Sequence, residues 1–365
     1  MEETQKLLDY LGGLSEVTND NYINILTQLL AFKEVWNQCD PKTYYKCVNA
    51  ATDCYIKANK LDDAMKLLSE EIVWCTENYP FETECISLLY HNQGKVFAFQ
   101  NHHNDAVKAF MVEIFYNLST NDNYSGFNFY SFRSPSQFTI DDLANNVITV
   151  VSPSQFNDPV DCMVFPWLEY KQNAECVMER DKRMMKALTE AYSHLKVRCF
   201  VSRQKLPTMK GEMQKSFKDT PEQFNTLMWS HYAQNHTGIC VQYCLPKSIT
   251  EADKELLTVS RLANVHYAST GDVTTDMCHS QAFFTKSKQW EYEDEVRLLH
   301  FDPTWNTDFK PIKLPQGSVK AVYFGLKCTE DTKNKIRKAL KYENVVYYQI
   351  EFEPKNIYQL KASKV

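Results

Sequence analysis

The segment WEYEDEVRLL, from Trp290 to Leu299, contains four acidic residues within five positions and then becomes apolar. If it forms a strand, Glu293, Glu295 and Arg297 share one face, because side chains alternate along a strand. The two glutamates then lie roughly 7 Å apart. An arginine can hold one carboxylate ionised, while apolar cover raises the pKa of the other. The pattern therefore predicts either an acid/base pair or a salt-bridge ladder facing water.

Positive charge and an aromatic surface lie directly upstream of these acids. Lys286, Lys288 and Trp290 precede the glutamates, and we expect them at the same edge of the strand. Asp158, Glu293 and Glu295 could together bind a magnesium ion, which makes a metal-dependent nuclease one hypothesis. The sequence contains no HExxH and no CxxC, so no defined metal site is predicted from a motif.

A second polar segment is SPSQFNDPVDC, residues 152–162. Asn157 and Asp158 can close turns with their own side chains, and Pro159 forces Asp158 into an extended conformation. Ser152 and Ser154 add hydroxyl groups just before the turn. The segment therefore predicts either a structural turn after a strand or a pocket wall that orients a polar ligand.

The third segment is MWSHYAQNHTGICVQY, residues 228–243. Helical spacing places Trp229, Tyr232 and Ala233 on one face, which is most simply a packing face. His231 points elsewhere, either as a hydrogen-bonding residue or as an acid/base group at a pocket rim. We include Tyr232 among the residues expected to contact a ligand.

Composition limits the classes of protein to consider. A chain of 365 residues fits two domains, and 9 glycines without GxGxxG or GxxxxGK[ST] argue against a dinucleotide fingerprint or a P-loop. A net charge of −6 means that a nucleic-acid partner would need a local basic patch. The acidic N-terminus, the absence of a spanning apolar run and 12 scattered cysteines predict a cytoplasmic protein with reduced thiols and no membrane contact.

Residues 1–118 have the pattern of successive helices. Two segments resemble each other at an offset of 42 residues, ATDCYIKANKLDDAMKLL and GKVFAFQNHHNDAVKAF. In each, a large residue precedes an alanine by nine positions, a spacing that resembles the tetratricopeptide helical hairpin. The second segment has more of the family's residues, namely Tyr90, Gly94, Phe97, Ala106 and Phe110. We expect a helical-repeat domain that binds a protein partner, with a generic helical bundle as the alternative.

Residues 119–126 form a polar, turn-rich linker, and the pattern changes after them. Over residues 127–365 strands and helices intermix without regular βαβ alternation. This predicts a mixed α+β domain with a central, largely antiparallel sheet.

Four short motifs of this second domain occur in an order that resembles the domain of unknown function 2971. They are the strand Tyr130–Arg133, the loop Phe156–Pro159, the segment Trp229–Ala233 followed by Gly238–Cys240, and the W-x-Y-E-x-E-x-R pattern of residues 290–297. The resemblance covers roughly residues 127 to 360. The family name implies no activity.

The order of an arginine strand, a serine-bearing strand and an E-x-E segment also resembles the ADP-ribosyltransferases, although their Ser-Thr-Ser triplet is absent. The resemblance implies that Arg133 grips NAD, that Ser152 or Ser154 positions it, and that Glu293 or Glu295 stabilises a ribosyl cation. NAD is then a candidate substrate, and the sequence does not identify a cofactor.

We therefore expect an enzyme that acts on a nucleotide or nucleic acid, joined to partner-binding repeats in a sensor–effector arrangement such as bacterial defence uses. A non-catalytic interaction or ligand-binding protein is the alternative. The expected catalytic residues are Glu293, Glu295 and His231, and the expected ligand-binding residues are Arg133, Ser152, Asn157, Asp158, Tyr232, Lys286, Trp290 and Arg297.

Overall fold

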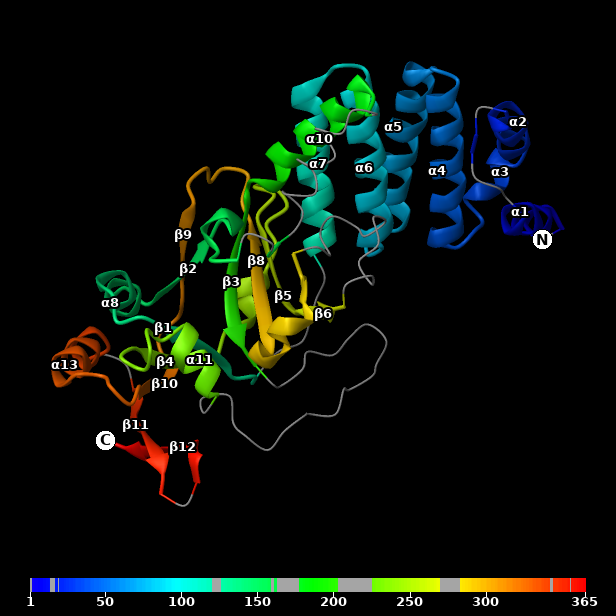
Figure 1. Ribbon diagram of the computed structural model, residues 1–365. Coiled ribbons are helices and arrows are strands. Elements are labelled where there is room, and N and C mark those ends of the chain that lie inside the picture. Colours follow the sequence, from blue (N-terminus) through cyan, green and yellow to red (C-terminus); the bar gives the residue numbers. More distant parts are fainter. Residues whose placement is uncertain are drawn as a thin grey trace. The chain divides into compact units, whose positions relative to one another are not determined.

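The computed structural model describes residues 2–13, 17–18, 20–119, 126–158, 161–162, 177–202, 225–269, 283–341, 344–354 and 356–365. The chain divides into two compact units (Figure 1). The helical unit comprises Met1–Thr120 and Phe165–His194, and the α+β unit comprises Asn121–Val164 and Leu195–Val365. Each unit has its own buried apolar residues. No described helix is long and apolar enough to cross a membrane.

The helical unit confirms the prediction that the N-terminal region is helical. Its helices are α1 (Glu2–Gly12), α2 (Tyr22–Ala31), α3 (Lys33–Trp36), α4 (Pro41–Lys57), α5 (Leu61–Asn78), α6 (Thr83–Phe99), α7 (His103–Leu118) and α10 (Glu179–Tyr192). From α4 to α7 each helix packs on the next, as in a stack of helical hairpins. Asp40 begins α4 by accepting from the backbone N–H groups of Lys42 and Thr43, with Pro41 at the first helical position.

Gly94 on α6 explains how closely α6 and α7 approach. A Cβ atom at this position would lie 2.5 Å from Cε1 of Phe110 on α7. Ala106, also on α7, is fully buried. Gly94 and Phe110, two of the residues at the spacing of the repeat family, therefore pack against each other, and the helical region is consistent with repeats.

Helix α10 follows β2 in sequence but packs on α6 and α7. The guanidinium of Arg183 donates to the carbonyl oxygens of Ala98 and Phe99, at 3.0 and 3.1 Å, and these carbonyls end α6. The helical unit therefore has a second segment, which a boundary at residue 118 does not include.

The α+β unit is built around one ten-stranded sheet. Its strands are β1 (Phe129–Arg133), β2 (Val147–Val151), β3 (Leu195–Val201), β4 (Ile239–Tyr243), β5 (Val259–Asn264), β8 (Glu295–Phe301), β9 (Phe309–Lys313), β10 (Val319–Phe324), β11 (Val346–Glu353) and β12 (Asn356–Lys364). Eight strands follow the order β12-β11-β10-β4-β1-β3-β2-β9. The other two branch from β3, which pairs with β8, and β8 pairs in turn with β5. Among the described strands of this sheet, β10 and β11 are the one pair that runs parallel, so the predicted α+β class with a largely antiparallel sheet is confirmed.

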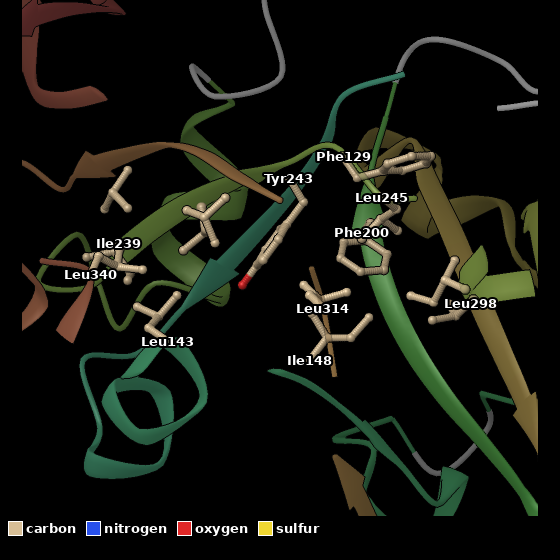
Figure 2. Close-up of a cluster of buried hydrophobic side chains, with 14 of the residues drawn as sticks. Phe129, Leu143, Ile148, Phe200, Ile239, Tyr243, Leu245, Leu298, Leu314 and Leu340 are labelled. Atoms are coloured by element: carbon tan, nitrogen blue, oxygen red, sulfur yellow. The ribbon is translucent and has the colours of Figure 1, made fainter. Parts of the chain in front are cut away.

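Short elements complete the unit. They are α8 (Gln137–Ala144), η1 (Pro153–Gln155), α11 (Thr226–His231), η3 (Lys247–Thr250), η4 (Lys288–Glu293), α13 (Glu330–Ala339) and the parallel pair β6 (His266–Ala268) and β7 (Thr285–Ser287). One face of the sheet is covered by α8 and α13, over the core shown in Figure 2, which includes Phe129, Phe200, Tyr243 and Leu298. The other face is covered by α11, whose Trp229 is fully buried.

The sheet opens beside β3. One edge of β3 pairs with β8 along its whole length. The other edge meets β1 only where Val201 lies opposite Tyr130, and β2 only where Val197 lies opposite Val151. Within the described chain, no strand pairs with that edge between these two points. The two diverging strands leave a gap in the sheet, which we call the β3 opening.

A buried ion pair joins the elements on either side of this gap. Arg133, at the end of β1, donates to Asp142 of α8 at 2.7 Å, and Thr149 of β2 donates to the same carboxylate at 2.8 Å. All three residues are buried. The pair fixes β1, α8 and β2 together and so fixes the shape of the β3 opening.

Candidate functional site

The segment that was predicted as one strand is half turn and half strand, so that prediction was wrong for its first half. Residues Lys288–Glu293 form the 3-10 turn η4, Asp294 is left-handed with φ 46 and ψ 49, and β8 begins at Glu295. Aspartate tolerates this backbone conformation better than most residues because its short side chain bonds locally. Glu293 and Glu295 therefore do not share a strand face, and the turn brings them together instead.

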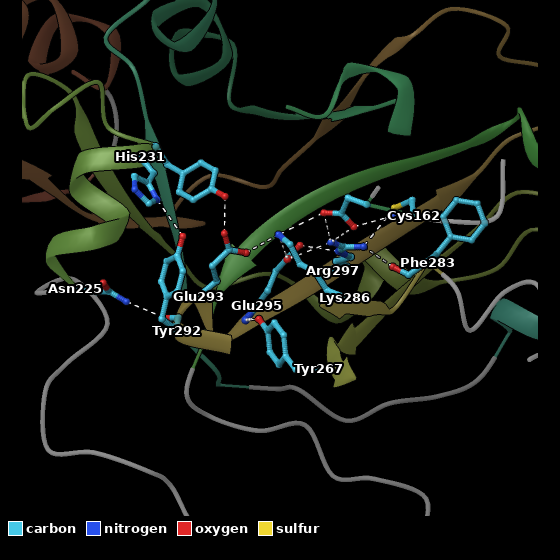
Figure 3. A network of polar contacts seen from close by, with 12 residues as sticks. Cys162, Asn225, His231, Tyr267, Phe283, Lys286, Tyr292, Glu293, Glu295 and Arg297 are labelled. Carbon is cyan, nitrogen blue, oxygen red and sulfur yellow. Dashed lines mark hydrogen bonds and ion pairs between the residues drawn. The ribbon is translucent and has the colours of Figure 1, made fainter. Parts of the chain in front are cut away.

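Three carboxylates converge on Lys286, which lies on β7 (Figure 3). Its Nζ lies 2.6 Å from Glu293 Oε2, 3.2 Å from Glu295 Oε2 and 3.3 Å from Asp161 Oδ2. The guanidinium of Arg297, fully buried, donates to Glu295 at 2.6 Å and to both oxygens of Asp161 at 2.7 and 2.8 Å. We call these five residues the carboxylate cluster. Three acids face two cations, which leaves one net negative charge when all are ionised.

Tyrosine hydroxyls surround the cluster. Tyr232 donates to Glu293 Oε1 at 2.5 Å, and the backbone N–H of Glu295 donates to the hydroxyl of Tyr267 at 2.8 Å. Tyr292 contacts His231 Nδ1 at 2.9 Å, and its carbonyl accepts from Asn225, the N-cap of α11. These bonds tie α11 and η4 to the cluster and restrict the positions of both glutamates.

The pKa values of the two glutamates are shifted in opposite directions. Burial raises the pKa of Glu293, although Lys286 and the Tyr232 hydroxyl act against this. Burial also acts to raise the pKa of Glu295, but Arg297 and Lys286 outweigh it and lower that pKa to about 2. A pair of neighbouring carboxyl groups with separated pKa values is a common arrangement for acid/base work, in which one group exchanges protons and the other stays charged.

A pocket of about 210 Å³ lies at the β3 opening. Residues 197–201 of β3 line it, together with the aromatic side chains of Tyr130, Phe132, Phe156 and Tyr232. Its polar lining from the cluster consists of Asp161, Lys286, Glu293 and Glu295. Ser131 and Arg198, whose side chains leave their strands toward the opposite face of the sheet, also line it. We call this cavity the β3 pocket.

Several predicted site residues do meet here. Glu293, Glu295, Tyr232, Lys286 and Asn157 line the pocket. Two other predicted residues contact side chains that line the pocket. Arg297 binds Glu295, and the indole of Trp290 lies 4.9 Å from Lys286 Nζ.

Other predicted residues lie elsewhere. Arg133 is buried against Asp142, and Ser152 is buried at the start of η1, where its N–H donates to the carbonyl of Asp308 at 2.7 Å. His231 is exposed and reaches Tyr292 rather than a glutamate. Asp158 is partly buried in the loop before the cluster, and neither it, Arg133, Ser152 nor His231 is among the residues that line the pocket.

Two residues were missed by reasoning from the sequence. Asp161 follows the FNDP turn by two positions, and a second acid in that loop, after Asp158, was the available signal. Arg198 interrupts the apolar strand LKVRCFV, and a charged residue at an inner strand position was the signal there. Both lie far in sequence from the glutamates, so only the folded sheet brings them to the site.

The cluster is held by cations that the chain itself supplies. Among the described residues, no group of three or more histidine, cysteine or acidic side chains is arranged to hold a metal ion. Where Asp161, Glu293 and Glu295 meet, the position between them is filled by Lys286 Nζ.

Comparisons with known proteins give one match. No match was found among curated proteins or among solved structures. Residues 228–298 match the family model described as "Protein of unknown function (DUF2971)". The matched segment runs from α11 into β8 and so includes Lys286, Glu293, Glu295 and Arg297. The match confirms, for these residues, the family resemblance of the sequence motifs.

Proposed function

We propose that the α+β unit is an enzyme that cleaves the N-glycosidic bond of a nucleotide, with NAD as the sharpest candidate, by hydrolysis or by transfer of ADP-ribose to an acceptor. The single observation that supports it most is the pair Glu293 and Glu295 in the wall of one pocket, with pKa values displaced in opposite directions. The proposal assigns them different roles.

The charge of the cluster suits this chemistry. When an N-glycosidic bond breaks, the ribose ring acquires positive charge, and a fixed negative charge in a low-dielectric site stabilises it. The cluster has one net negative charge when its acids are ionised, and the paired Glu295 stays ionised across the physiological range. A cluster with equal numbers of acidic and cationic side chains would have no net negative charge to stabilise the ribose.

Glu293 is assigned the proton transfer. The bond between ribose C1′ and the base nitrogen breaks, and its electron pair leaves with the base. A water or acceptor hydroxyl oxygen then bonds to C1′, and its proton passes to the ionised Glu293 carboxylate. A raised pKa makes Glu293 the stronger base of the two, and Tyr232 and Lys286 hold it in place.

The pocket also suits a nucleoside. Its aromatic lining, which includes Tyr130 and Phe132, offers ring surfaces for a base. Its volume of about 210 Å³ is below the roughly 300–1,000 Å³ typical of sites that enclose a drug-sized ligand. The pocket therefore fits the reacting part of a dinucleotide, with the remainder outside it.

The test is nicotinamide release from NAD by the full chain, alone and with protein or nucleic-acid acceptors. Glu293→Gln is expected to lower the rate about 10²–10⁴-fold, as for removal of a general base. Glu291→Gln is the matched control, because Glu291 lies in the same turn but is exposed. Absence of release under all conditions, or equal rates for both variants, would refute the proposal.

A non-catalytic ligand-binding protein is the second candidate. It is favoured by the fact that each charged member of the cluster is paired within the cluster, as in a network that only stabilises a fold. The two candidates differ in one result. A binding protein retains bound nucleotide unchanged, whereas the enzyme converts it and loses this conversion with Glu293→Gln.

The helical unit is proposed to bind a protein partner that controls the α+β unit, in the sensor–effector arrangement known from bacterial defence. Large apolar side chains are exposed on it, with Phe81 at 93% and Val73 at 55% exposure. A partner that copurifies with the full chain in a fixed ratio, and is lost with Phe81→Ser, would support this role. Retention of that partner by Phe81→Ser would place its binding elsewhere.

A further inference from the structure

Among the described residues, Arg198 has no acidic partner, unlike the arginines Arg133 and Arg297 near the β3 pocket. Arg133 is paired with Asp142, and Arg297 is paired with Asp161 and Glu295. Arg198 donates from Nη2 to the hydroxyl of Ser131 at 2.6 Å, and its Nε is buried without a hydrogen-bond partner. In the part of the chain that the structure describes, Arg198 forms no ion pair. A guanidinium in this state has unused donors and an unbalanced charge.

The charge around Arg198 is positive overall. Arg133 and Arg198 lie close enough that Arg133 helps burial to lower the pKa of Arg198, to about 10, so the guanidinium is still charged at neutral pH. Asp142 is the nearby acid whose charge acts on Arg198, but its carboxylate is already bonded to Arg133 and Thr149. Two cations against one acid leave one net positive charge beneath the β3 opening. Burying such a charge costs free energy that an anion would offset.

The pocket gives a ligand access to this charge. Ser131, Arg198 and Phe200 line it although they belong to the face opposite Glu295, because the sheet is open between β1 and β2. Arg198 is three residues from Val201, which pairs with Glu295. Three strand residues span roughly 10 Å. A ligand in the pocket can therefore contact the negative cluster with one part and Arg198 with another.

We propose that Arg198, oriented by Ser131, binds a phosphate group of the ligand in the β3 pocket, so that the ligand is a phosphorylated riboside and not a free nucleoside. The planar fork of a guanidinium matches two oxygens of a phosphate, and the N–H groups at Nη1 and Nη2 of Arg198 that Ser131 does not use supply the donors. This inference rests on the proposed function, because it names the part of the substrate that lies beyond the ribose.

The experiment is calorimetric titration of the full chain with ADP-ribose and ribose 5-phosphate, and with adenosine and ribose as unphosphorylated counterparts. The phosphorylated probes are expected to bind more tightly than their counterparts. Arg198→Gln is expected to weaken the binding of the phosphorylated probes about 10- to 100-fold, the usual size of a lost charge-assisted hydrogen bond, and to leave adenosine binding unchanged. Lys288→Gln, at an exposed lysine of the same unit, is the control for general charge effects.

The inference is overturned if ADP-ribose binds no better than adenosine, or if Arg198→Gln weakens both equally while the variant remains folded. Where Arg198→Gln does not fold, Arg198→Lys keeps the charge but removes the fork, and it must still weaken ribose 5-phosphate selectively. The two proposals fail separately. Arg198-dependent phosphate binding without nicotinamide release refutes only the proposed reaction, and release with an unchanged KM in Arg198→Gln refutes only the phosphate subsite.

Discussion

The carboxylates of Glu293 and Glu295 both accept from the Nζ of Lys286, at 2.6 and 3.2 Å, although one belongs to a 3-10 turn and the other to a strand. Only Glu295 is also bound by Arg297, at 2.6 Å. The shared lysine brings the two acids together, and the unshared arginine makes their ionisation differ. This asymmetry distinguishes the roles of the two residues and can be tested on stability as well as on activity.

Replacing Glu295 is expected to cost more stability than replacing Glu293. Glu295→Gln leaves the buried Arg297 with less compensation, and breaking a buried ion pair typically costs about 3–5 kcal/mol. Glu293→Gln keeps an oxygen that accepts from Tyr232 or Lys286, so its loss should be smaller. Urea unfolding at pH 7 measures both. Equal losses would mean that Arg297 does not depend on Glu295 for its compensation.

The hydroxyl of Tyr232 is expected to set the pH at which Glu293 becomes active. Its hydrogen bond favours the ionised carboxylate, so Tyr232→Phe should raise the pKa of Glu293 further. Because the proposed reaction needs ionised Glu293, activity rises with pH through this pKa, and that limb should move up by about one pH unit. The measurement is the pH profile of nicotinamide release.

Tyr292→Phe is the matched control for this shift, since the Tyr292 hydroxyl contacts His231 and not the carboxylate. Each variant removes one tyrosine hydroxyl from the contacts between α11 and the η4 turn. A shift of the same size in both would show that the effect comes from the packing of α11 on η4 and not from the bond to Glu293.

Much of the site was predictable because its parts are close in sequence. Lys286, Glu293, Glu295 and Arg297 fall within twelve residues, and their types already indicated a charged cluster. The strand geometry assigned to them was wrong, because alternation rules cannot anticipate the left-handed Asp294 that ends η4. The two glutamates nevertheless lie close together, because the turn at Asp294 brings their side chains to the same lysine.

The rest depended on contacts between distant segments. Asp161 reaches Arg297 across 136 positions, and nothing in the FNDP loop specifies that partner. Arg198 faces the pocket because β1 and β2 diverge beside it. The divergence arises because each of these strands pairs with β3 at one position, and a single sequence does not show how far two strands will pair. For the same reason the sequence did not predict that α10, which follows β2, belongs to the helical unit.

Gly94 gives a test of the helical unit. Gly94→Ala places a Cβ 2.5 Å from the ring of Phe110, which is fully buried and has little room to move. Overpacking of this kind is expected to lower the free energy of unfolding by about 1–3 kcal/mol. Gly12→Ala is the control, because a Cβ there meets nothing within 4 Å, and alanine favours the helix by up to about 1 kcal/mol. Urea unfolding measures the free energy of unfolding of both variants. If Gly94→Ala leaves it unchanged, α6 and α7 move apart at no cost.

His300 is expected to make the stability of the α+β unit depend on pH. Its Nδ1 lies 2.7 Å from the hydroxyl of Ser260, and burial, with Lys310 and Lys196, lowers its pKa to about 3. The unfolded chain takes up a proton near pH 6.5 and the folded chain does not, so stability is complete above pH 6.5 and falls on acidification toward pH 3. Between pH 7 and 5 this residue should cost at most about 2 kcal/mol.

The difference between wild type and His300→Gln isolates this contribution. The variant should lose less free energy of unfolding than the wild type between pH 7 and pH 5, because glutamine does not titrate. His266→Gln, at an exposed position on β6, should keep the wild-type dependence. If His300→Gln also keeps it, the histidine accepts a proton in the folded state and cannot be the buried neutral group that its contacts with Ser260 and the nearby lysines require.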